Sequence, residues 1–444
     1  MKKSLRLVAM LLMCWLCNMV AYSQLTTFDE VIAMKKKTEA LSRAAQYFNE
    51  LEPVNISILQ LQGICQKAAL GDVQAMVQIA DMCFYGDGVK QNLKVAYEWY
   101  QQAANAGNGQ AMAMLGGMYK TGQGTTQDYE KAVYWFQKGI QKDNAQAMVQ
   151  MGTMYIEGTG VAQDLARGLQ WTRKAAEKGD AMAMMNLGYL YLQGQGVEKS
   201  VTQAIAWFEK SSALNNVFAM ANLGDIYYFG KEGSRDYSKA MRWYLKAAEG
   251  GATAPMYYIG QMYFYGEGVQ QSYSQAMEWF LKAANNGLPE AMNRMAVMWS
   301  RGLGVAADPD VALEWLKMAA GQGLPIAMYN LGIEYFNRDN KDASVEMIQK
   351  AINTQDIEVS EYLGKLLYDG NYYGGKNLEG AFQLFYHAAT DEKEPRGNAM
   401  HYLSLCYRFG HGTAKDLQQA DYWEKKAQET GSDESDAMFQ LLTK

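Results

Sequence analysis

The apolar positions of residues 181–216 follow the spacing of two successive helices. In the first half, Leu187 and Tyr191 are four residues apart, and in the second half Ala204 and Trp207 are three residues apart. These intervals place side chains on one face of a helix. The segment therefore predicts a helix-turn-helix unit with one apolar stripe on each helix.

Two glycines, Gly194 and Gly196, separate the two predicted helices. Glycine tolerates the backbone conformations that end a helix and form a turn. The same pair recurs along the chain at multiples of 36 residues. Its other members are Gly86 and Gly88, Gly122 and Gly124, Gly158 and Gly160, Gly266 and Gly268, Gly302 and Gly304, and Gly410 and Gly412.

Tryptophan and methionine keep the same period of 36 residues. The tryptophans are Trp99, Trp135, Trp171, Trp207, Trp243, Trp279 and Trp315, with Trp423 three periods later. The methionines are Met76, Met112, Met148, Met184, Met220, Met256, Met292 and Met328, with Met400 two periods later. Such a period is typical of a repeated helical unit that buries its apolar stripe against its neighbours. We therefore predict that both series form the core.

Small residues occupy a further repeated position. A glycine follows an apolar residue of the first helix at Gly116, Gly152, Gly188, Gly224, Gly260 and Gly332. Because helices approach closely only where side chains are small, we predict that two helices cross there. Pro289 and Pro325 are expected to begin first helices, where the missing N–H of proline costs little.

The period slips once, near the C-terminal end. Leu331–Gly332 is followed by Leu363–Gly364 after 32 residues and by Leu403–Ser404 after 40 more, so the total of two periods is kept. We predict two degenerate units at residues 337–397 and seven to eight regular units at residues 70–336. Residues 24–69 are predicted to form an N-terminal helical cap, and residues 398–444 the last repeat and a C-terminal cap.

Residues 1–23 have the pattern of a secretory signal peptide. Lys2, Lys3 and Arg6 precede an apolar stretch that is too short to span a bilayer comfortably, and Ala21-Tyr22-Ser23 has the small residues of a cleavage site. The sequence thus predicts export, and in a bacterium a periplasmic or extracellular location. A single membrane anchor is the alternative.

Composition and charge exclude several classes of protein. Of 444 residues, 49% are apolar and 20% are charged, and the mean hydropathy is -0.29, which is typical of a globular protein. Without the three basic residues of the signal, 38 basic residues face 47 acidic ones, a net charge of -9. An acidic chain is repelled by phosphate backbones, so we expect no nucleic-acid partner. We also expect no stable membrane span after signal cleavage.

The sequence carries no enzyme or cofactor motif that stands out. Three histidines, His387, His401 and His411, lie near the C-terminus without a zinc-protease pattern, and the periodic Gly-x-Gly turns lack the rest of a nucleotide-binding motif. We therefore predict no catalytic residue, metal or cofactor. After signal cleavage Cys65, Cys83 and Cys406 remain; Cys65 and Cys83 are either bridged or buried as free thiols.

The repeated residues resemble the Sel-one-like repeat, a relative of the tetratricopeptide repeat. The pattern A-x-A-x-x-x-L-G-x-x-Y-x-x-G-x-G-V-x-x-D-x-x-K-A-x-x-W-x-x-K-A-A-x-x-G is nearly complete in residues 145–179 and 252–287. The resemblance implies an all-α, right-handed α-solenoid (superhelix) of about ten helix-turn-helix repeats. It also implies a non-enzymatic scaffold or adaptor whose partner is another protein or peptide. Its oligomeric state stays open.

The resemblance further implies that the first helices line a concave face that holds an extended peptide. The residue before each Leu-Gly pair is expected to face solvent there, and aromatic residues late in the first helix are expected to act as anchors. The predicted partner-binding residues are Gln150, Asn186, Asn222, Tyr228, Phe229, Tyr258, Phe264, Tyr265, Arg294 and Asn330. Packing of the aromatic residues against a neighbouring helix is the alternative. A carbohydrate- or peptidoglycan-binding protein of the cell envelope, or a hydrolase with an unrecognised site, are alternative functions.

Overall fold

The computed structural model describes residues 51–230, 233–370, 375–391, 393 and 395–430, together with the single residues 39 and 48. The predicted signal peptide, most of the predicted N-terminal cap and residues 431–444 of the predicted C-terminal cap lie outside the described residues. Within the described part, all named elements are helices, and one isolated bridge joins Pro53 and Val89. The predicted all-α repeat architecture is confirmed.

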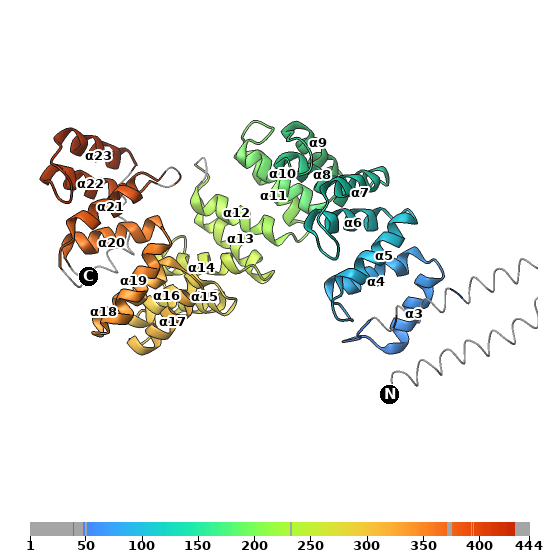
Figure 1. Ribbon diagram of the computed structural model, residues 1–444, viewed down its shortest axis with the longest axis horizontal. Coiled ribbons are helices and arrows are strands. Elements are labelled where there is room, and N and C mark those ends of the chain that lie inside the picture. Colours follow the sequence, from blue (N-terminus) through green and yellow to red (C-terminus); the bar gives the residue numbers. More distant parts are fainter. Residues whose placement is uncertain are drawn as a thin grey trace, which may run out of the picture. The chain divides into compact units, whose positions relative to one another are not determined.

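After α3 (Ile58–Ala69), a first helix and a second helix alternate along the chain (Figure 1). The first helices are α4 (Val73–Tyr85), α6 (Gly109–Thr121), α8 (Ala145–Glu157), α10 (Ala181–Gln193), α12 (Val217–Phe229), α14 (Thr253–Tyr265), α16 (Pro289–Arg301), α18 (Pro325–Asn337), α20 (Ile357–Asp369) and α22 (Gly397–Phe409). The second helices are α5 (Leu93–Asn105), α7 (Tyr129–Gln141), α9 (Leu165–Glu177), α11 (Val201–Ser212), α13 (Tyr237–Glu249), α15 (Tyr273–Asn285), α17 (Pro309–Gly321), α19 (Lys341–Asn353), α21 (Leu378–Ala389) and α23 (Leu417–Thr430).

The helices fall into two compact units whose division lies within α12. Among the described residues, the first unit ends at Leu223, with Gly233 added, and the second comprises Gly224–Gly230 and the chain from Ser234 onward. The segment 337–397, where the sequence predicts degenerate repeats, contains α19, α20 and α21.

Polar caps and glycines set the length of each helix. The side chain of Asp128 accepts the backbone N–H of Lys131 at 3.0 Å and so begins α7. Gly122 ends α6 in the left-handed region at a φ of 75°. At Gly124, two residues later, an added Cβ would collide with the carbonyl oxygen of Leu93. The first glycine of the predicted pair is therefore needed for its left-handed backbone, and the second because no side chain fits there. Pro289 and Pro325 begin α16 and α18, as predicted.

The closest approach within a repeat joins a small residue of the first helix to a large residue of the second. An added Cβ on Gly116 would lie 2.6 Å from the ring of Phe136, and one on Gly188 would lie 2.8 Å from the ring of Phe208. The same contact recurs between Gly224 and Tyr244, Gly260 and Phe280, Gly332 and Ile348, and Gly364 and Phe385. These glycines are therefore among the predicted crossing points, and each one leaves room for a buried side chain. Gly152, the remaining predicted crossing point, differs, because it faces the smaller Thr172 and the backbone of Gly168.

Neighbouring positions change together with this contact. Where the large residue is a tyrosine, an aspartate one residue after the small position accepts its hydroxyl: Tyr100 donates to Asp81 at 2.5 Å, and Tyr244 donates to Asp225 at 2.8 Å. In the last repeat Glu424 occupies the position of the large residue and Ser404 that of the small one. The hydroxyl of Ser404 donates to the carboxylate of Glu424 at 2.7 Å. A buried polar atom without a hydrogen-bond partner costs free energy. Each repeat with a polar residue at the large position therefore also has a side chain that forms a hydrogen bond with it.

The tryptophan series is less buried than the sequence predicts. Trp99 and Trp423 are buried, whereas the other six are half-buried. A lysine three residues later lies over the ring of several of them, for example Lys210 at 3.9 Å from the centroid of Trp207. In the six repeats whose tryptophan is half-buried, the buried residue is the one after the tryptophan, because it faces the small residue of the first helix. The core assignment therefore shifts by one position along the second helix.

Gly116 and its neighbour Gly117 give a matched test of the small-to-large contact. Gly116→Ala should lower the free energy of unfolding by about 1–3 kcal/mol, because the new Cβ overlaps the ring of Phe136. An added Cβ at Gly117 meets nothing within 4 Å, so Gly117→Ala should raise stability by about 0.5–1 kcal/mol through helix propensity. Urea denaturation followed by circular dichroism measures both; equal effects of the two substitutions would contradict the contact.

Phe208 and Trp207 test the revised core assignment. Phe208→Ala should cost about 3–5 kcal/mol, because it empties a fully buried position. Trp207→Ala should cost less, because its ring is half-exposed and covered on one face by Lys210. Thermal melts of both variants compare the two losses, and a larger loss for Trp207→Ala would restore the original assignment.

Candidate partner-binding surface

Each first helix presents one face whose residues differ from repeat to repeat. Its second, sixth, ninth and thirteenth residues are four, three and four positions apart, so they share one side of the helix. We call this side the first-helix face. In α4 it consists of Gln74, Gln78, Asp81 and Tyr85.

An open pocket of about 550 Å³ lies on the first-helix face of the first unit. Gln74, Gln78, Asp81 and Tyr85 of α4 line it, together with Gln110 of α6. The side chain of Tyr85 is 65% exposed. The pocket thus combines three side-chain amides, the carboxylates of Asp81 and Asp87, and an accessible aromatic ring. None of these residues is among the partner-binding residues predicted from the sequence.

The predicted partner-binding residues of the first unit are all half-exposed. Gln150 and Asn186 are the sixth residues of α8 and α10 and lie on the first-helix face. Asn222 has the same place in α12, but its amide donates to the carbonyl of Phe218 in its own helix at 2.8 Å. The carbonyl oxygen of that amide stays available to accept a hydrogen bond.

Tyr228 and Phe229 have different surroundings. The hydroxyl of Tyr228 donates to Glu267 at 2.8 Å, and its ring lies 5.4 Å from the ring of Tyr258. Burial, followed by the carboxylate of Glu267, raises the pKa of Tyr228 well above its ordinary value. Phe229 is 47% exposed. Tyr228 therefore packs against the next repeat, which was the alternative to a partner contact, and Phe229 stays accessible.

The aromatic residues of α14 also pack against other residues of the second unit to different extents. The ring of Tyr258 stacks on that of Tyr244 at 5.4 Å with an interplanar angle of 12°. Phe264 is only 4% exposed and packs against Tyr273 and Phe280, so the structure corrects its assignment from partner anchor to core. Tyr265 is half-buried beside it.

Arg294 and Asn330 do not face solvent as the sequence analysis expected. The Nε of Arg294 donates to the hydroxyl of Tyr257 at 3.4 Å, and its Nη1 is buried without a hydrogen-bond partner among the described residues. Asn330 is 8% exposed and donates to Asn293 at 3.0 Å. Each of these side chains reaches back toward the preceding first helix, so neither extends freely into solvent.

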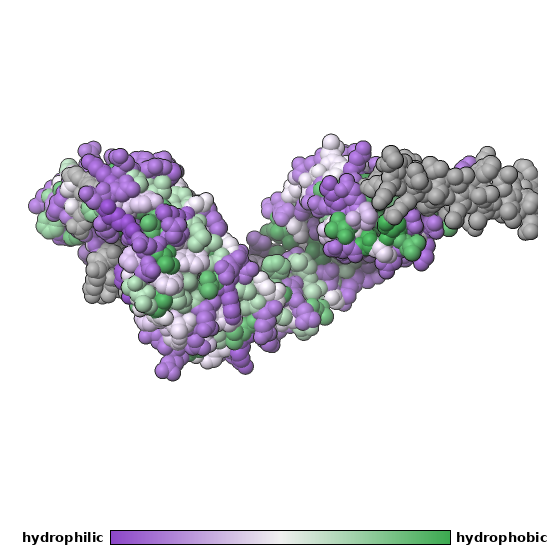
Figure 2. Space-filling model, turned by 90° about the horizontal axis from the view of Figure 1, so that it is seen from below, coloured by the Kyte–Doolittle hydropathy of each residue, from purple (hydrophilic) through white to green (hydrophobic). Residues whose placement is uncertain are grey.

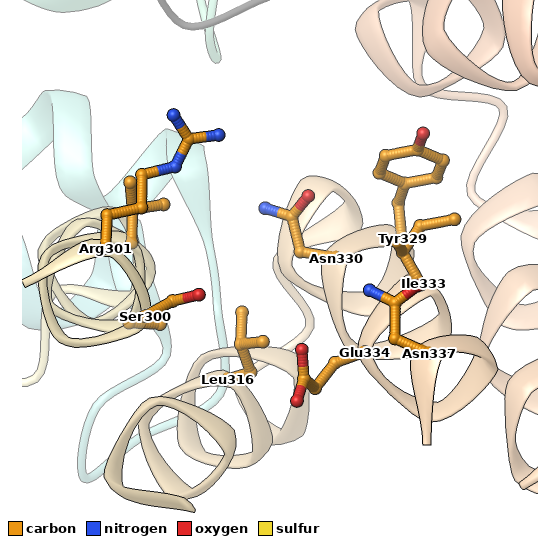
Figure 3. A pocket seen from close by; sticks show the side chains of 10 residues that line it. Ser300, Arg301, Leu316, Tyr329, Asn330, Ile333, Glu334 and Asn337 are labelled. Carbon is orange, nitrogen blue, oxygen red and sulfur yellow. The ribbon is translucent and has the colours of Figure 1, made fainter. Parts of the chain in front are cut away.

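A second pocket, of about 190 Å³, opens between α16 and α18 in the second unit (Figure 3). Arg301 and Ser300 stand on one wall, Asn330 and Glu334 on the facing wall, and Leu316 of α17 between them. Sequence reasoning selected Asn330 here but missed Arg301, which is the thirteenth residue of its helix and equivalent to Tyr265.

Serine and histidine residues come together twice in the second unit, without the order that a nucleophilic catalyst needs. Glu424 lies between His401, at 3.0 Å, and Ser404, at 2.7 Å, so the serine hydroxyl meets a carboxylate instead of an imidazole. Ser360 contacts His387 Nδ1 at 3.1 Å, but its hydroxyl also donates to a backbone carbonyl of its own helix. These groups act as hydrogen-bond partners within the repeats.

The Sel1 repeat family matches nine segments of the chain. They are residues 73–108, 109–144, 145–180, 181–216, 217–251, 256–288, 289–324, 325–353 and 397–427, and together they cover more than half of the sequence. The chain belongs to the Sel1 repeat family. The resemblance seen in the sequence is therefore confirmed.

Two solved structures with this fold are similar to the chain. One is a protective antigen of uropathogenic Escherichia coli; it is 30% identical, has a TM-score of 0.58, and the match covers 84% of this chain and 79% of that one. The other is a Sel1 repeat protein of Oxalobacter formigenes; it is 31% identical, has a TM-score of 0.50, and the match covers 55% of this chain and 99% of that one. The curated proteins contain no significant match.

Sel1 repeats form a scaffold that is typical of protein–protein interaction and generally non-catalytic. Among the residues that the structure describes, no group of three or more histidine, cysteine or acidic side chains could hold a metal ion. The Nδ1 of His411 lies 2.8 Å from the hydroxyl of Tyr368. In this part of the chain no helix is long and apolar enough to span a bilayer.

Cys65, Cys83 and Cys406 are free and buried. Burial raises the pKa of Cys65 to about 11, and burial together with Cys65 raises that of Cys83 to about 12.

Exposed apolar side chains form separate small groups among polar ones on the face seen in Figure 2. Such scattered exposure is normal, so specific pockets of the first-helix face are better candidates for binding than general hydrophobicity.

Glu424 gives the last repeat a pH-dependent stability. Burial opposes its ionisation, but hydrogen bonds from Ser404 and His401 together lower its pKa. Its contribution is therefore present at neutral pH and is lost as the pH falls below about 4.3. Glu424→Gln should reduce protection of α22 and α23 from hydrogen exchange at pH 7 by about 1 kcal/mol, with little effect at pH 3. An equal loss at both pH values would rule out the charge as the cause.

Proposed function

We propose that the chain is an exported, non-enzymatic scaffold that holds an extended segment of a partner protein on its first-helix face. The observation that carries the proposal is the pocket formed by α4 and α6. Gln74, Gln78 and Gln110 line it, and side-chain amides can donate to and accept from a peptide backbone whatever its sequence. Tyr85 adds a large, accessible ring of the kind that anchors protein interfaces.

Export is the second part of the proposal. It rests on the basic residues, apolar stretch and small-residue cleavage site of residues 1–23. In a bacterium this places the scaffold in the periplasm or outside the cell, where its partner would be another exported protein or an extracellular segment of a membrane protein.

A carbohydrate of the cell envelope is the second candidate ligand. The same pocket holds the exposed ring of Tyr85 beside the carboxylates of Asp81 and Asp87. An aromatic face and carboxylate acceptors suit the apolar faces and hydroxyl groups of a sugar. The two candidates differ in what lies against Tyr85 in the cell.

Photo-crosslinking tests this proposal. Tyr85 on a first helix and Tyr134 on a second helix are both tyrosines, 65% and 52% exposed, so each can be replaced by a photoreactive benzoylphenylalanine. In cells producing the full chain, Tyr85 should give a protein adduct at least about fivefold more abundant than that from Tyr134. The adduct should weaken when Gln78→Ala and Gln110→Ala are added.

The remaining outcomes separate the candidates. A protease-resistant adduct that glycan hydrolases remove would support the carbohydrate and contradict the peptide. Equal adducts from both positions, or an adduct only from Tyr134, would contradict any role of the first-helix face.

A further inference from the structure

The pocket between α16 and α18 exists because one repeat carries smaller residues than the repeat before it. Phe264, Phe280 and Arg294 fill the corresponding positions one period earlier, where both phenylalanines are buried. In the pocket these positions hold Ser300, Leu316 and Asn330. Three large side chains are thus replaced by smaller ones at a single place, while the helices that hold them are kept.

Arg301 brings an uncompensated positive charge to this pocket. Within the part of the chain that the structure describes, its guanidinium has no ion pair and no hydrogen bond, and burial lowers its pKa. Glu334 faces the same pocket but is already held by Arg338 at 2.7 Å. Arg338 in turn binds Asp310 at 2.7 Å. The pocket therefore offers a half-buried cation whose neighbouring carboxylate is already neutralised.

The rest of the lining suits one apolar side chain and a piece of peptide backbone. Ala296, Val297, Leu316 and Ile333 supply apolar surface. The volume of about 190 Å³ is below the range of roughly 300–1,000 Å³ that is usual for small-molecule sites. Asn330 uses its amide N–H to bind Asn293, which leaves its carbonyl oxygen able to accept a backbone N–H.

We propose that this pocket binds the C-terminal residue of a peptide, with its apolar side chain inside and its terminal carboxylate on Arg301. A C-terminal apolar residue carries both groups on one Cα, which matches an apolar cavity with a cation at its wall (Figure 3). Arginine binds carboxylates through two parallel N–H donors, and partial burial strengthens such a bond. The inference rests on the proposed function, because it specifies which end of a partner segment the second unit holds.

The test uses the purified full chain and fluorescein-labelled peptides of the sequence Gly-Ser-Gly-Ser-Leu. The peptide with a free C-terminal carboxylate should bind at least about tenfold more tightly than the same peptide with a C-terminal amide, measured by fluorescence anisotropy. A peptide ending in Gly should bind more weakly than the one ending in Leu. Equal binding of acid and amide, or no binding of either at millimolar protein, would overturn the proposal.

Three variants locate the effect. Arg301→Gln should abolish the preference for the acid over the amide, whereas Arg242→Gln, on the exposed surface of α13, should leave it intact. Ser300→Phe restores the residue found one period earlier and should fill the pocket, which removes binding of both peptides without a change of charge. Unchanged discrimination in Arg301→Gln would overturn the proposal, provided that circular dichroism shows the same helicity.

A further peptide distinguishes a terminal carboxylate from a side-chain carboxylate. Gly-Ser-Gly-Glu-Leu with a C-terminal amide should bind no better than the neutral amide, and binding as tight as that of the free acid would contradict the C-terminal assignment. If none of these peptides binds but a protein adduct forms at Tyr85, the C-terminal site is contradicted and the proposed function is still supported. If no adduct forms at Tyr85 although the free-acid peptide binds, the proposed function is contradicted.

Discussion

The contact between a small residue of the first helix and a large residue of the second, present in nearly all the described repeats, is the constraint on which the fold depends. Gly116 and Phe136 show it in its commonest form, with no space for a Cβ between helix and ring. A helix pair that meets so closely buries one large side chain completely, and this burial offsets part of the conformational entropy lost by two short helices. The repeats then need only caps and left-handed glycines to set where each helix begins and ends.

The repeat architecture could be predicted from the sequence because it is copied many times. Each unit repeats the same glycines, tryptophans and methionines, so the period and both helices are visible without any structure. Burial of individual positions was harder to predict. Trp207 and Phe208 are adjacent and aromatic, and the tryptophan position recurs unchanged whereas the next one varies. Only the packing shows that Phe208 faces Gly188 while Lys210 covers Trp207.

The candidate sites depend on positions where the repeats differ, and for these a single sequence gives little guidance. Arg294 occupies a position expected to face solvent, yet it reaches back to Tyr257. Arg301 was not selected, although its pocket follows from smaller residues at Ser300 and Leu316, which a comparison with Phe264 and Phe280 could have revealed. The positions that the repeats share maintain the fold, and the positions of the first-helix face carry chemistry that differs between units.

A double-mutant cycle at Gly116 and Phe136 tests this account most directly. The pair Gly116→Ala and Phe136→Leu reproduces the natural combination of Ala296 and Leu316. If the two positions share one space, the double variant should be more stable than the sum of the single losses predicts, by at least about 1 kcal/mol in urea denaturation. Additive losses would show that the small and large residues act independently, and would contradict the contact as the basis of the repeat.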